Sequence, residues 1–252
     1  MELAKMTWPA IKALAPHTPI VLPIAALEQH SHHLPVFTDT LLVQEIARRV
    51  NATMGDRLLF APVMWLGNSL HHLEFAGTMS ASPRTYLDLL RDMIECHLTH
   101  GFRRVVLLNG HGGNSVPAQQ ALYELRQKYR DRSDQLFLLA NYWALGSNPR
   151  EAIAGLTQPQ IQHACQWETA MMLHAHPELV GDLQDLEPVD YGNPFLPANR
   201  SGIMRDFTAS GHVGDPRAAS AEIGAALLDT YAADVTRLLQ RVVDWDGRSW
   251  SG

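Results

Sequence analysis

The side chains best suited to chemistry gather between residues 28 and 39 of the sequence. Glu28 and His30 are two positions apart, so they would project to the same side of an extended backbone, and Asp39 follows them. The apolar residues 19–25 come directly before and predict a buried strand, whose carboxyl end is where open α/β sheets place their sites. Carboxylate oxygens and imidazole nitrogens together suit Zn²⁺ or Mn²⁺. The alternative is a solvated loop that happens to be rich in histidine.

A second group follows another apolar run, residues 103–109, which also predicts a strand. Residues 109–114 have the sequence Asn-Gly-His-Gly-Gly-Asn. Gly112 and Gly113 would let the backbone turn tightly and bring the His111 imidazole close to a metal or a substrate. Their backbone amides could also bind an oxyanion or a phosphate. Taken alone, however, a glycine-rich turn between a strand and a helix is more often structural.

A third group lies in residues 163–169, where Glu168 has apolar neighbours. A carboxylate is costly to bury unless it is paired or bound to a metal, although a lone glutamate is more often a satisfied core group or a surface group. The candidate metal ligands are two histidines and three carboxylates: Glu28, His30, Asp39, His111 and Glu168. This set fits two metal ions that share one carboxylate better than a single tetrahedral ion. The spacing of these residues leaves open whether they converge.

The elements that must position these groups alternate between short apolar runs and longer helical stretches. This alternation predicts an α/β fold with a mostly parallel sheet covered on both faces. Residues 183–210 are poor in periodicity and rich in Pro, Gly and Asn, which indicates a long functional loop or a partner contact. No linker, repeat or charge block divides the chain, so a single domain is expected over residues 1–252. The predicted strands are residues 19–25, 58–63, 103–109 and 136–143, and the predicted helices are residues 40–50, 82–100, 115–129, 167–174 and 218–243.

Composition limits the classes of protein to which the chain can belong. Its 252 residues include 20 basic and 26 acidic side chains, and the net charge of −6 argues against a nucleic-acid binder, which normally shows a basic face. The 18% share of charged residues and the 46% share of hydrophobic ones exclude intrinsic disorder. Two cysteines cannot make a disulfide framework, so a cytoplasmic location is expected. No apolar run approaches the ~18 residues of a membrane span, so no membrane partner is expected.

The three motifs resemble those of the creatininase (creatinine amidohydrolase) family. Residues 23–39 look like its first signature, residues 109–114 are similar to its second, and residues 168–170 resemble its Glu-Thr-Ser motif. Residues 75–78 resemble a Phe-Pro-Gly-Thr segment, and residues 211–224 a late Gly-Asp-Pro element. The resemblance covers about residues 7–240. It implies a three-layer α/β/α fold, often assembled as a hexamer, with two Zn²⁺ or Mn²⁺ ions per chain and Fe²⁺ as an alternative.

The resemblance also implies a role for each site residue. Glu28 and His111 would hold one metal, His30 and Glu168 would hold the other, and Asp39 would bridge the two. His163 stands where the family has a histidine proposed to carry protons to the leaving nitrogen, and His163 and Glu168 are the expected catalytic residues. The expected substrate contacts are Trp143, which matches an aromatic lining the creatininase pocket, together with His72, Gly112 and Gly113.

The function implied is a dinuclear metal-dependent amidohydrolase. It would use a metal-activated water to cleave an amide, cyclic amide or formamide C–N bond of a small molecule, rather than an ordinary peptide bond. Creatininases carry a glutamate at the position of Gly113 and a tryptophan at that of Pro159, so creatinine itself is not expected as the substrate. The alternatives are a deformylase acting on a formamidopyrimidine nucleotide, a peptidase that trims the precursor peptide of a redox cofactor, and a non-catalytic metal-binding homologue. Apart from the substrate, the expected partners are further copies of the chain.

Overall fold

Four parallel strands form the sheet in the described part of the computed structural model, which comprises residues 1–146, 148–190 and 192–248. The order across the sheet is β2-β1-β3-β4, so the two strands that precede the first two motifs are neighbours. All strand pairs are parallel, which confirms the predicted sheet. The last residues of the expected domain, 249–252, lie outside the described residues. The strands are β1 (Ile20–Ile24), β2 (Leu59–Phe60), β3 (Arg104–Asn109) and β4 (Leu136–Asn141).

The register of the central strands determines where the site lies. All residues of β1 are buried, and so are all residues of β3 except the half-buried Arg104, as is typical of a parallel strand covered on both faces. Ile24 at the end of β1 pairs with Asn109 at the end of β3, and Asn109 pairs in turn with Asn141 of β4. The segments that follow β1, β3 and β4 therefore leave the sheet side by side at one edge.

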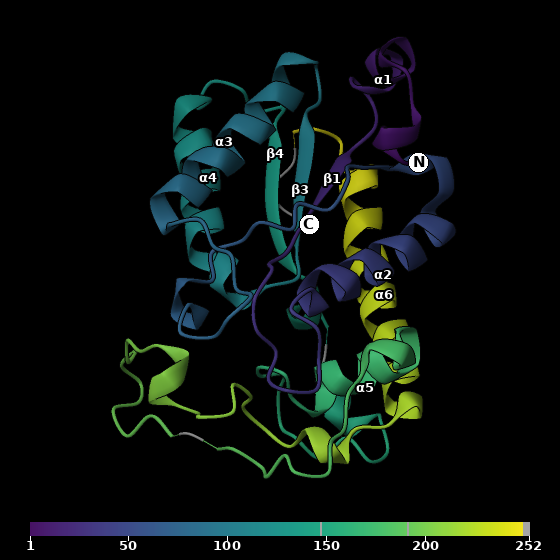
Figure 1. The fold of residues 1–252 in the computed structure, drawn as a ribbon. Coiled ribbons are helices and arrows are strands. Elements are labelled where there is room, and N and C mark those ends of the chain that lie inside the picture. Colours follow the sequence, from purple (N-terminus) through teal and green to yellow (C-terminus); the bar gives the residue numbers. More distant parts are fainter. Residues whose placement is uncertain (147, 191, 249–252) are drawn as a thin grey trace.

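Helices cover both faces of the sheet, which confirms the three-layer fold (Figure 1). One face packs against α3 and α4, and the other packs against α2, α5 and α6. Ser82 begins α3 by accepting a hydrogen bond from the Thr85 backbone N–H, as a helix N-cap does. The helices are α1 (Trp8–Leu14), α2 (Thr38–Met54), α3 (Pro83–Thr99), α4 (Ser115–Lys128), α5 (Gln166–Ala175) and α6 (Ala221–Asp244).

Two predicted strands are shorter in the structure than in the prediction. The strand expected over residues 58–63 is reduced to β2, because Pro62 has no N–H to donate to a ladder. The strand expected over residues 136–143 ends at Asn141, since residues 142–144 form a 3₁₀ turn. The remaining predicted strands and helices are present with small shifts of their ends.

Residues 183–190 and 192–210, the described part of the predicted segment 183–210, are largely irregular, and Figure 1 shows them extending away from the sheet. Within its described residues, the helical structure is one 3₁₀ turn at Met204–Asp206. The Arg205 guanidinium lies 4.6 Å from the centre of the Phe75 ring and so anchors this turn to the segment after β2. No helix in the described part of the chain is long and apolar enough to cross a lipid bilayer.

Gly224 allows α6 to lie directly against α5, and replacing it with alanine should destabilise the protein. A Cβ at this position would lie 1.8 Å from the carbonyl oxygen of Ala170, a backbone atom that cannot rotate away. Overpacking of this kind costs about 1–3 kcal/mol, and we expect about 3 kcal/mol here because backbone must move. Urea unfolding measures the effect. Gly112→Ala is the control, since a Cβ there meets nothing within 4 Å, and equal stabilities of the two variants would contradict the prediction.

Candidate metal centre

The structure brings the five predicted ligands together at the carboxyl edge of the sheet. Two of them follow β1, one lies in the first turn of α2, one follows β3 and one lies in the first turn of α5. All five are at most 8% exposed, so the group is buried rather than solvated. The alternative of a solvated histidine-rich loop is therefore wrong for these side chains. The five are Glu28, His30, Asp39, His111 and Glu168.

Asp39 lies between the two histidines of this group. Its Oδ1 is 3.2 Å from Nε2 of His30, and its Oδ2 is 3.1 Å from Nδ1 of His111. Each carboxylate oxygen thus faces a different imidazole. This is the arrangement expected of a carboxylate that is shared between two cations.

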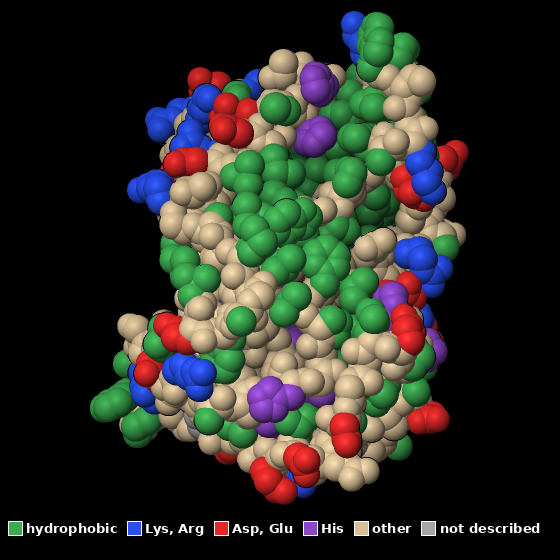
Figure 2. Space-filling view, in the orientation of Figure 1, with side chains coloured by type: hydrophobic (Ala, Val, Ile, Leu, Met, Phe, Trp, Pro, Cys, Tyr) green, Lys and Arg blue, Asp and Glu red, His purple; other side chains and the backbone are tan. Residues whose placement is uncertain are grey.

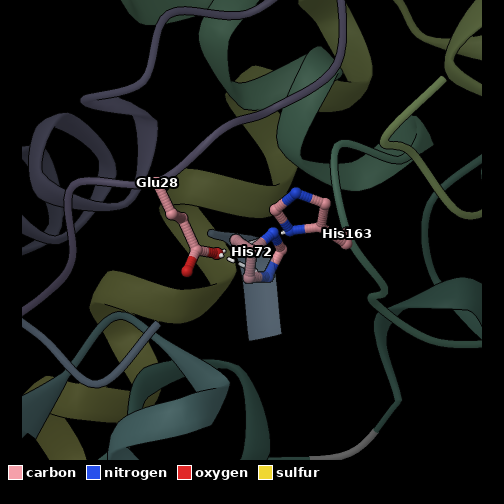
Figure 3. Close-up of side chains that lie close together, drawn as sticks. All are labelled: Glu28, His72 and His163. Atoms are coloured by element: carbon pink, nitrogen blue, oxygen red, sulfur yellow. Dashed lines mark ion pairs between the residues drawn. The ribbon is translucent and has the colours of Figure 1, made fainter. Parts of the chain in front are cut away.

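Glu28 faces three further nitrogen atoms. Its Oε2 is 3.3 Å from Nε2 of His111, while its Oε1 is 3.4 Å from Nε2 of His72 and 3.5 Å from Nδ1 of His163. Figure 3 shows the Glu28 side chain pointing toward the rings of His72 and His163. The ring of His71 stacks on that of His111 with the centroids 5.9 Å apart, so a fourth imidazole borders this part of the site.

Glu168 completes the other side of the site. Its Oε2 accepts a hydrogen bond of 2.5 Å from the backbone N–H of Ala164. Donor atoms of Glu168, His30 and His163 lie within 4.8 Å of one another, as do those of Glu28, His30 and Asp39. The potential ligand groups therefore overlap, and a chain of donor atoms runs from Glu28 through Asp39 and His30 to Glu168.

The hydrogen bonding of the buried atoms tests whether cations fit this site. Glu28 Oε2, His30 Nε2 and Asp39 Oδ2 are fully buried, and each faces another ligand of the site at 3.1–3.3 Å without forming a hydrogen bond of good geometry. Buried polar atoms are normally hydrogen-bonded. Cations held between these atoms would satisfy all three, so the donor set fits a metal centre.

The protonation of the ligands depends on their mutual charges. Burial opposes a charge on His30, but Asp39 and then Glu168 outweigh it and raise the pKa of His30 to about 9. Burial raises the pKa of Glu168 to about 8, although His30 acts against it. Burial also opposes ionisation of Glu28, but His111 and His72 hold the pKa of that carboxyl well below its ordinary value. Burial opposes a charge on His111 as well, but Glu28 and Asp39 hold its pKa well above the ordinary value. At neutral pH, the protein without metal therefore carries protons on His30, His111 and Glu168 where cations would sit.

Metal affinity should consequently rise with pH. His30 and Glu168 are protonated below their pKa values of about 9 and about 8, and each must lose its proton to become a ligand. The pKa of His111 is raised as well, so we expect the apparent affinity for Zn²⁺ to increase up to ~1000-fold per pH unit between pH 6 and 8, because up to three protons are displaced. Competition with a chromophoric chelator at several pH values measures this dependence. An affinity that stays constant over this range would contradict it.

Comparison with known proteins agrees with this geometry. A family profile described as "Creatininase: Creatinine amidohydrolase" matches residues 4–239. The chain belongs to the creatininase family. Within this family, the chain is 31% identical over 249 residues to a mycofactocin precursor peptide peptidase of Mycobacterium ulcerans, covering 95% of this chain and 86% of that protein. It is also 31% identical over 195 residues to a creatinine amidohydrolase of Pseudomonas putida, covering 71% and 73% of the two chains.

Solved creatininase structures share the fold of this family member. One creatininase crystal structure has a TM-score of 0.82 and 26% sequence identity, and it covers 95% of this chain and 96% of its own. Another, titled "Creatininase Mn", has a TM-score of 0.79 and 28% identity, with 95% and 97% covered. A creatininase variant of the Zn-Zn type has a TM-score of 0.81 and 26% identity, with the same coverage.

The residues expected to contact substrate differ in how closely they approach the ligands. His72 is buried beside Glu28, and Gly112 and Gly113 begin a 3₁₀ turn directly after His111. Trp143 follows β4 at the same edge of the sheet, where its ring packs edge-on against Tyr142.

Tyr142 is an aromatic residue of this region that the sequence motifs do not single out, since they point to its neighbour Trp143. Burial and then the nearby carboxylate of Glu168 hold the pKa of Tyr142 well above its ordinary value, so its phenol is neutral and lies close to the ligands. The alternation of side chains after β4 is lost in a 3₁₀ turn, and the sequence therefore gave no basis for choosing between the two aromatic residues.

Other missed residues hold His111 in place. Asn109 Nδ2 donates to the carbonyl of His111 at 2.7 Å, and Asn109 Oδ1 accepts from its N–H at 3.1 Å. His111 Nε2 lies 3.1 Å from the carbonyl oxygen of Asn68 and 3.3 Å from Oγ of Ser69. Asn109 is a polar residue at the end of an apolar strand and belongs to the predicted turn motif, so the sequence itself marks it as a candidate for supporting His111. Asn68 and Ser69 belong to no motif that would mark them in this way.

Gly113 is the position at which any side chain would disturb His111. A Cβ there would lie 2.3 Å from the carbonyl oxygen of Asn68 and 2.5 Å from Nε2 of His111. Since the same carbonyl holds the imidazole, Gly113→Ala should lower metal affinity by ~10–100-fold, as loss of groups that orient ligands commonly does. Titration with Zn²⁺ measures this, and Gly112→Ala is the matched neighbour because its Cβ meets nothing within 4 Å. Equal affinities in both variants would contradict the prediction.

Proposed function

We propose that this member of the creatininase family is a metal-dependent amidohydrolase that cleaves an amide C–N bond by means of an activated water. The observation that carries this proposal is the buried set of five ligand-type side chains, three of whose ligand atoms make no hydrogen bond. The names of its relatives support hydrolysis, since they include an amidohydrolase and a peptidase.

We assign the ligands to two ions. Glu28 and His111 would hold one and His30 and Glu168 the other, while Asp39 would be shared because its two oxygens face different histidines. Mixed carboxylate and imidazole donors suit Zn²⁺ and Mn²⁺, and solved relatives are titled with one or the other. When bound, such ions would lower the pKa of a water molecule to about 7 and polarise the carbonyl of the substrate.

His163 would move the proton in this reaction. Burial, followed by the neighbouring rings of His30 and His72, holds the pKa of His163 well below its ordinary value, so the ring is neutral. Its Nδ1 faces Glu28 at 3.5 Å. From this place it could take a proton from the attacking water and return it to the leaving nitrogen, as a general base and then a general acid.

A small amide other than creatinine is the first candidate substrate. Creatininases carry a glutamate where this chain has Gly113, and here a Cβ alone would collide with His111 and with the carbonyl of Asn68. A larger side chain at that position is therefore incompatible with this arrangement of the site. Pro159, which stands where creatininases have a tryptophan, is a second difference.

A peptide is the second candidate substrate. The observation that favours it is the 31% identity to a mycofactocin precursor peptide peptidase over 95% of this chain. The open space beside Gly112, where a Cβ would meet nothing within 4 Å, also suits a larger substrate than creatinine. The same ligands and the same proton carrier would serve either bond, since both are amides.

Metal analysis and a substrate panel test the proposal together. After reconstitution with Zn²⁺ or Mn²⁺ we expect about two ions per chain, and fewer in His30→Ala and Glu168→Ala. The panel contains creatinine, formamides, small lactams and short peptides. Wild-type protein that binds no metal would overturn the proposal, and activity on creatinine alone would overturn the argument from Gly113 and Pro159. Cleavage of peptides alone would favour the second candidate.

Bound metal without turnover on any member of the panel would favour the non-catalytic alternative.

We also propose that the protein is cytoplasmic, since its two cysteines, exposed Cys96 and buried Cys165, are unpaired as in a reducing compartment. Self-association is a further proposal. Figure 2 shows hydrophobic side chains gathered in the middle of one face, and light scattering on the purified protein would measure its mass in solution.

A further inference from the structure

The side chain of Gln29, between two proposed metal ligands, has an orientation that its main-chain contacts determine. Gln29 is 4% exposed. Its Oε1 accepts from the backbone N–H of Ser31 at 2.8 Å, and its Nε2 donates to the carbonyl of Gly211 at 2.8 Å. A backbone N–H can only donate and a carbonyl oxygen can only accept, so the two contacts agree on which end of the amide is oxygen.

The main-chain oxygen of Gln29 determines where His163 carries its hydrogen. Nε2 of His163 lies 2.8 Å from this oxygen, which can only accept, so Nε2 must bear the hydrogen. The same Nε2 is 3.0 Å from the Gln29 amide nitrogen, but a protonated ring nitrogen cannot accept a second hydrogen. In the neutral ring, Nδ1 then carries the lone pair, and it faces Glu28 Oε1 at 3.5 Å.

The remaining N–H of the Gln29 amide determines the state of His72. It points to Nδ1 of His72 at 2.9 Å, and this nitrogen must accept because the amide nitrogen only donates. His72 therefore carries its hydrogen on Nε2, which lies 3.4 Å from Glu28 Oε1. Figure 3 shows both rings beside the Glu28 carboxylate. They thus face the same carboxylate oxygen with opposite polarity, His72 with an N–H and His163 with a lone pair.

We infer that Gln29 is a positioning residue that fixes opposite tautomers at His72 and His163, its side chain acting on the former and its carbonyl on the latter. The site is thereby given one hydrogen-bond donor and one proton acceptor at adjacent places. His163 can take the proton that the attacking water loses and pass it to the leaving nitrogen, while the His72 N–H remains to donate to an oxygen. Only this chemical consequence rests on the proposed function; the tautomers themselves do not.

Long-range ¹H–¹⁵N correlation spectra of ¹⁵N-histidine-labelled, Zn²⁺-loaded protein test the inference. The spectra distinguish protonated from bare ring nitrogens, and His72→Gln and His163→Gln identify the signals. In the wild type we expect hydrogen on Nε2 of both rings. In Gln29→Glu the carboxylate can no longer donate, so His72 should move its hydrogen to Nδ1. His163 should be unchanged, because its partner is a main-chain oxygen. Hydrogen on Nδ1 of His72 or of His163 in the wild type would overturn the inference.

The matched control is Gln119→Glu, the same change at an exposed position of α4, which should leave both rings as they are. If Gln29→Glu does not fold, Gln29→Met removes the donor while keeping the length of the side chain, and His72 should then show a mixture of tautomers. A folded variant at position 29 whose His72 is unchanged would overturn the inference.

Kinetics separate positioning from a merely structural role. In Gln29→Glu we expect kcat to fall by ~10–100-fold while the metal content and KM remain as in the wild type, since the proposed metal ligands themselves are unchanged. An unchanged kcat would overturn the positioning role. A wild type that shows the expected tautomers but hydrolyses no member of the substrate panel would overturn the proposed function and leave the positioning by Gln29 intact.

Discussion

Replacing Asp39 with asparagine should abolish nearly all hydrolytic activity and remove metal from both positions. The two oxygens of Asp39 face His30 and His111 at 3.2 and 3.1 Å. An asparagine would keep the shape but offer a single oxygen, and its NH₂ group would face one of the two ions. Transition-state stabilisation by metal ions amounts to several kcal/mol, so we expect kcat/KM to fall by ~10³-fold or more. Steady-state kinetics and metal analysis of the same preparation measure the two effects.

Asp92→Asn is the matched control for this experiment. Asp92 is an exposed residue of α3, so the same chemical change there should alter neither metal content nor activity. A reduced activity of Asp39→Asn with two ions still bound would show that the carboxylate acts otherwise than as a shared ligand. Full activity of this variant would contradict the assignment of the metal centre.

Replacing His163 with glutamine should remove turnover and leave the metal in place. The ring is neutral, with its Nδ1 directed at the site and its Nε2 bonded to the carbonyl of Gln29. A glutamine can reproduce a hydrogen bond but cannot accept and return a proton. Since general acid–base catalysis contributes ~10²–10⁴-fold, we expect a loss of kcat of that size with little change in KM.

His174→Gln provides the comparison for this variant, because His174 is exposed near the end of α5. Its activity should equal that of the wild type. If His163→Gln lost metal as well as turnover, His163 would be a ligand together with His30 and Glu168, whose donor atoms are within 4.8 Å. A kcat that stays unchanged across pH would contradict the proton-carrying role.

The fold was predictable where the sequence carries a strong local signal. The apolar runs of β1 and β3 are buried on both faces, and the start of α3 is marked by the Ser82 cap and Pro83. By contrast, the seven-residue helix α1 was not predicted; it is short, it has no buried residue, and its nearly all-apolar sequence does not separate a core face from a solvent face. The strand predicted over residues 58–63 is too long because Pro62 has no N–H to donate to a ladder.

The position of the site was predictable because parallel strands end at the same edge. Motifs that follow β1 and β3 must then meet, and five candidate ligands do so. The contacts of Gln29 were not predictable, because they depend on backbone conformations that the sequence pattern does not reveal. Ser31 and Ala164 have positive φ angles of 61° and 48°, a region that residues other than glycine seldom occupy. These turns orient the side chains of the site in directions that differ from the alternating directions of side chains along a regular strand.

The packing of α5 has a consequence for synthesis of the protein. Glu168 lies on α5, and this helix packs more extensively against α6 than against any other described element. α6 spans residues 221–244, so it leaves the ribosome after every other described helix. Domains generally fold as units, and a nascent chain would thus offer an incoming ion an incomplete set of donors. A metal ion bound at this site would therefore meet its complete set of donors only after α6 has been made.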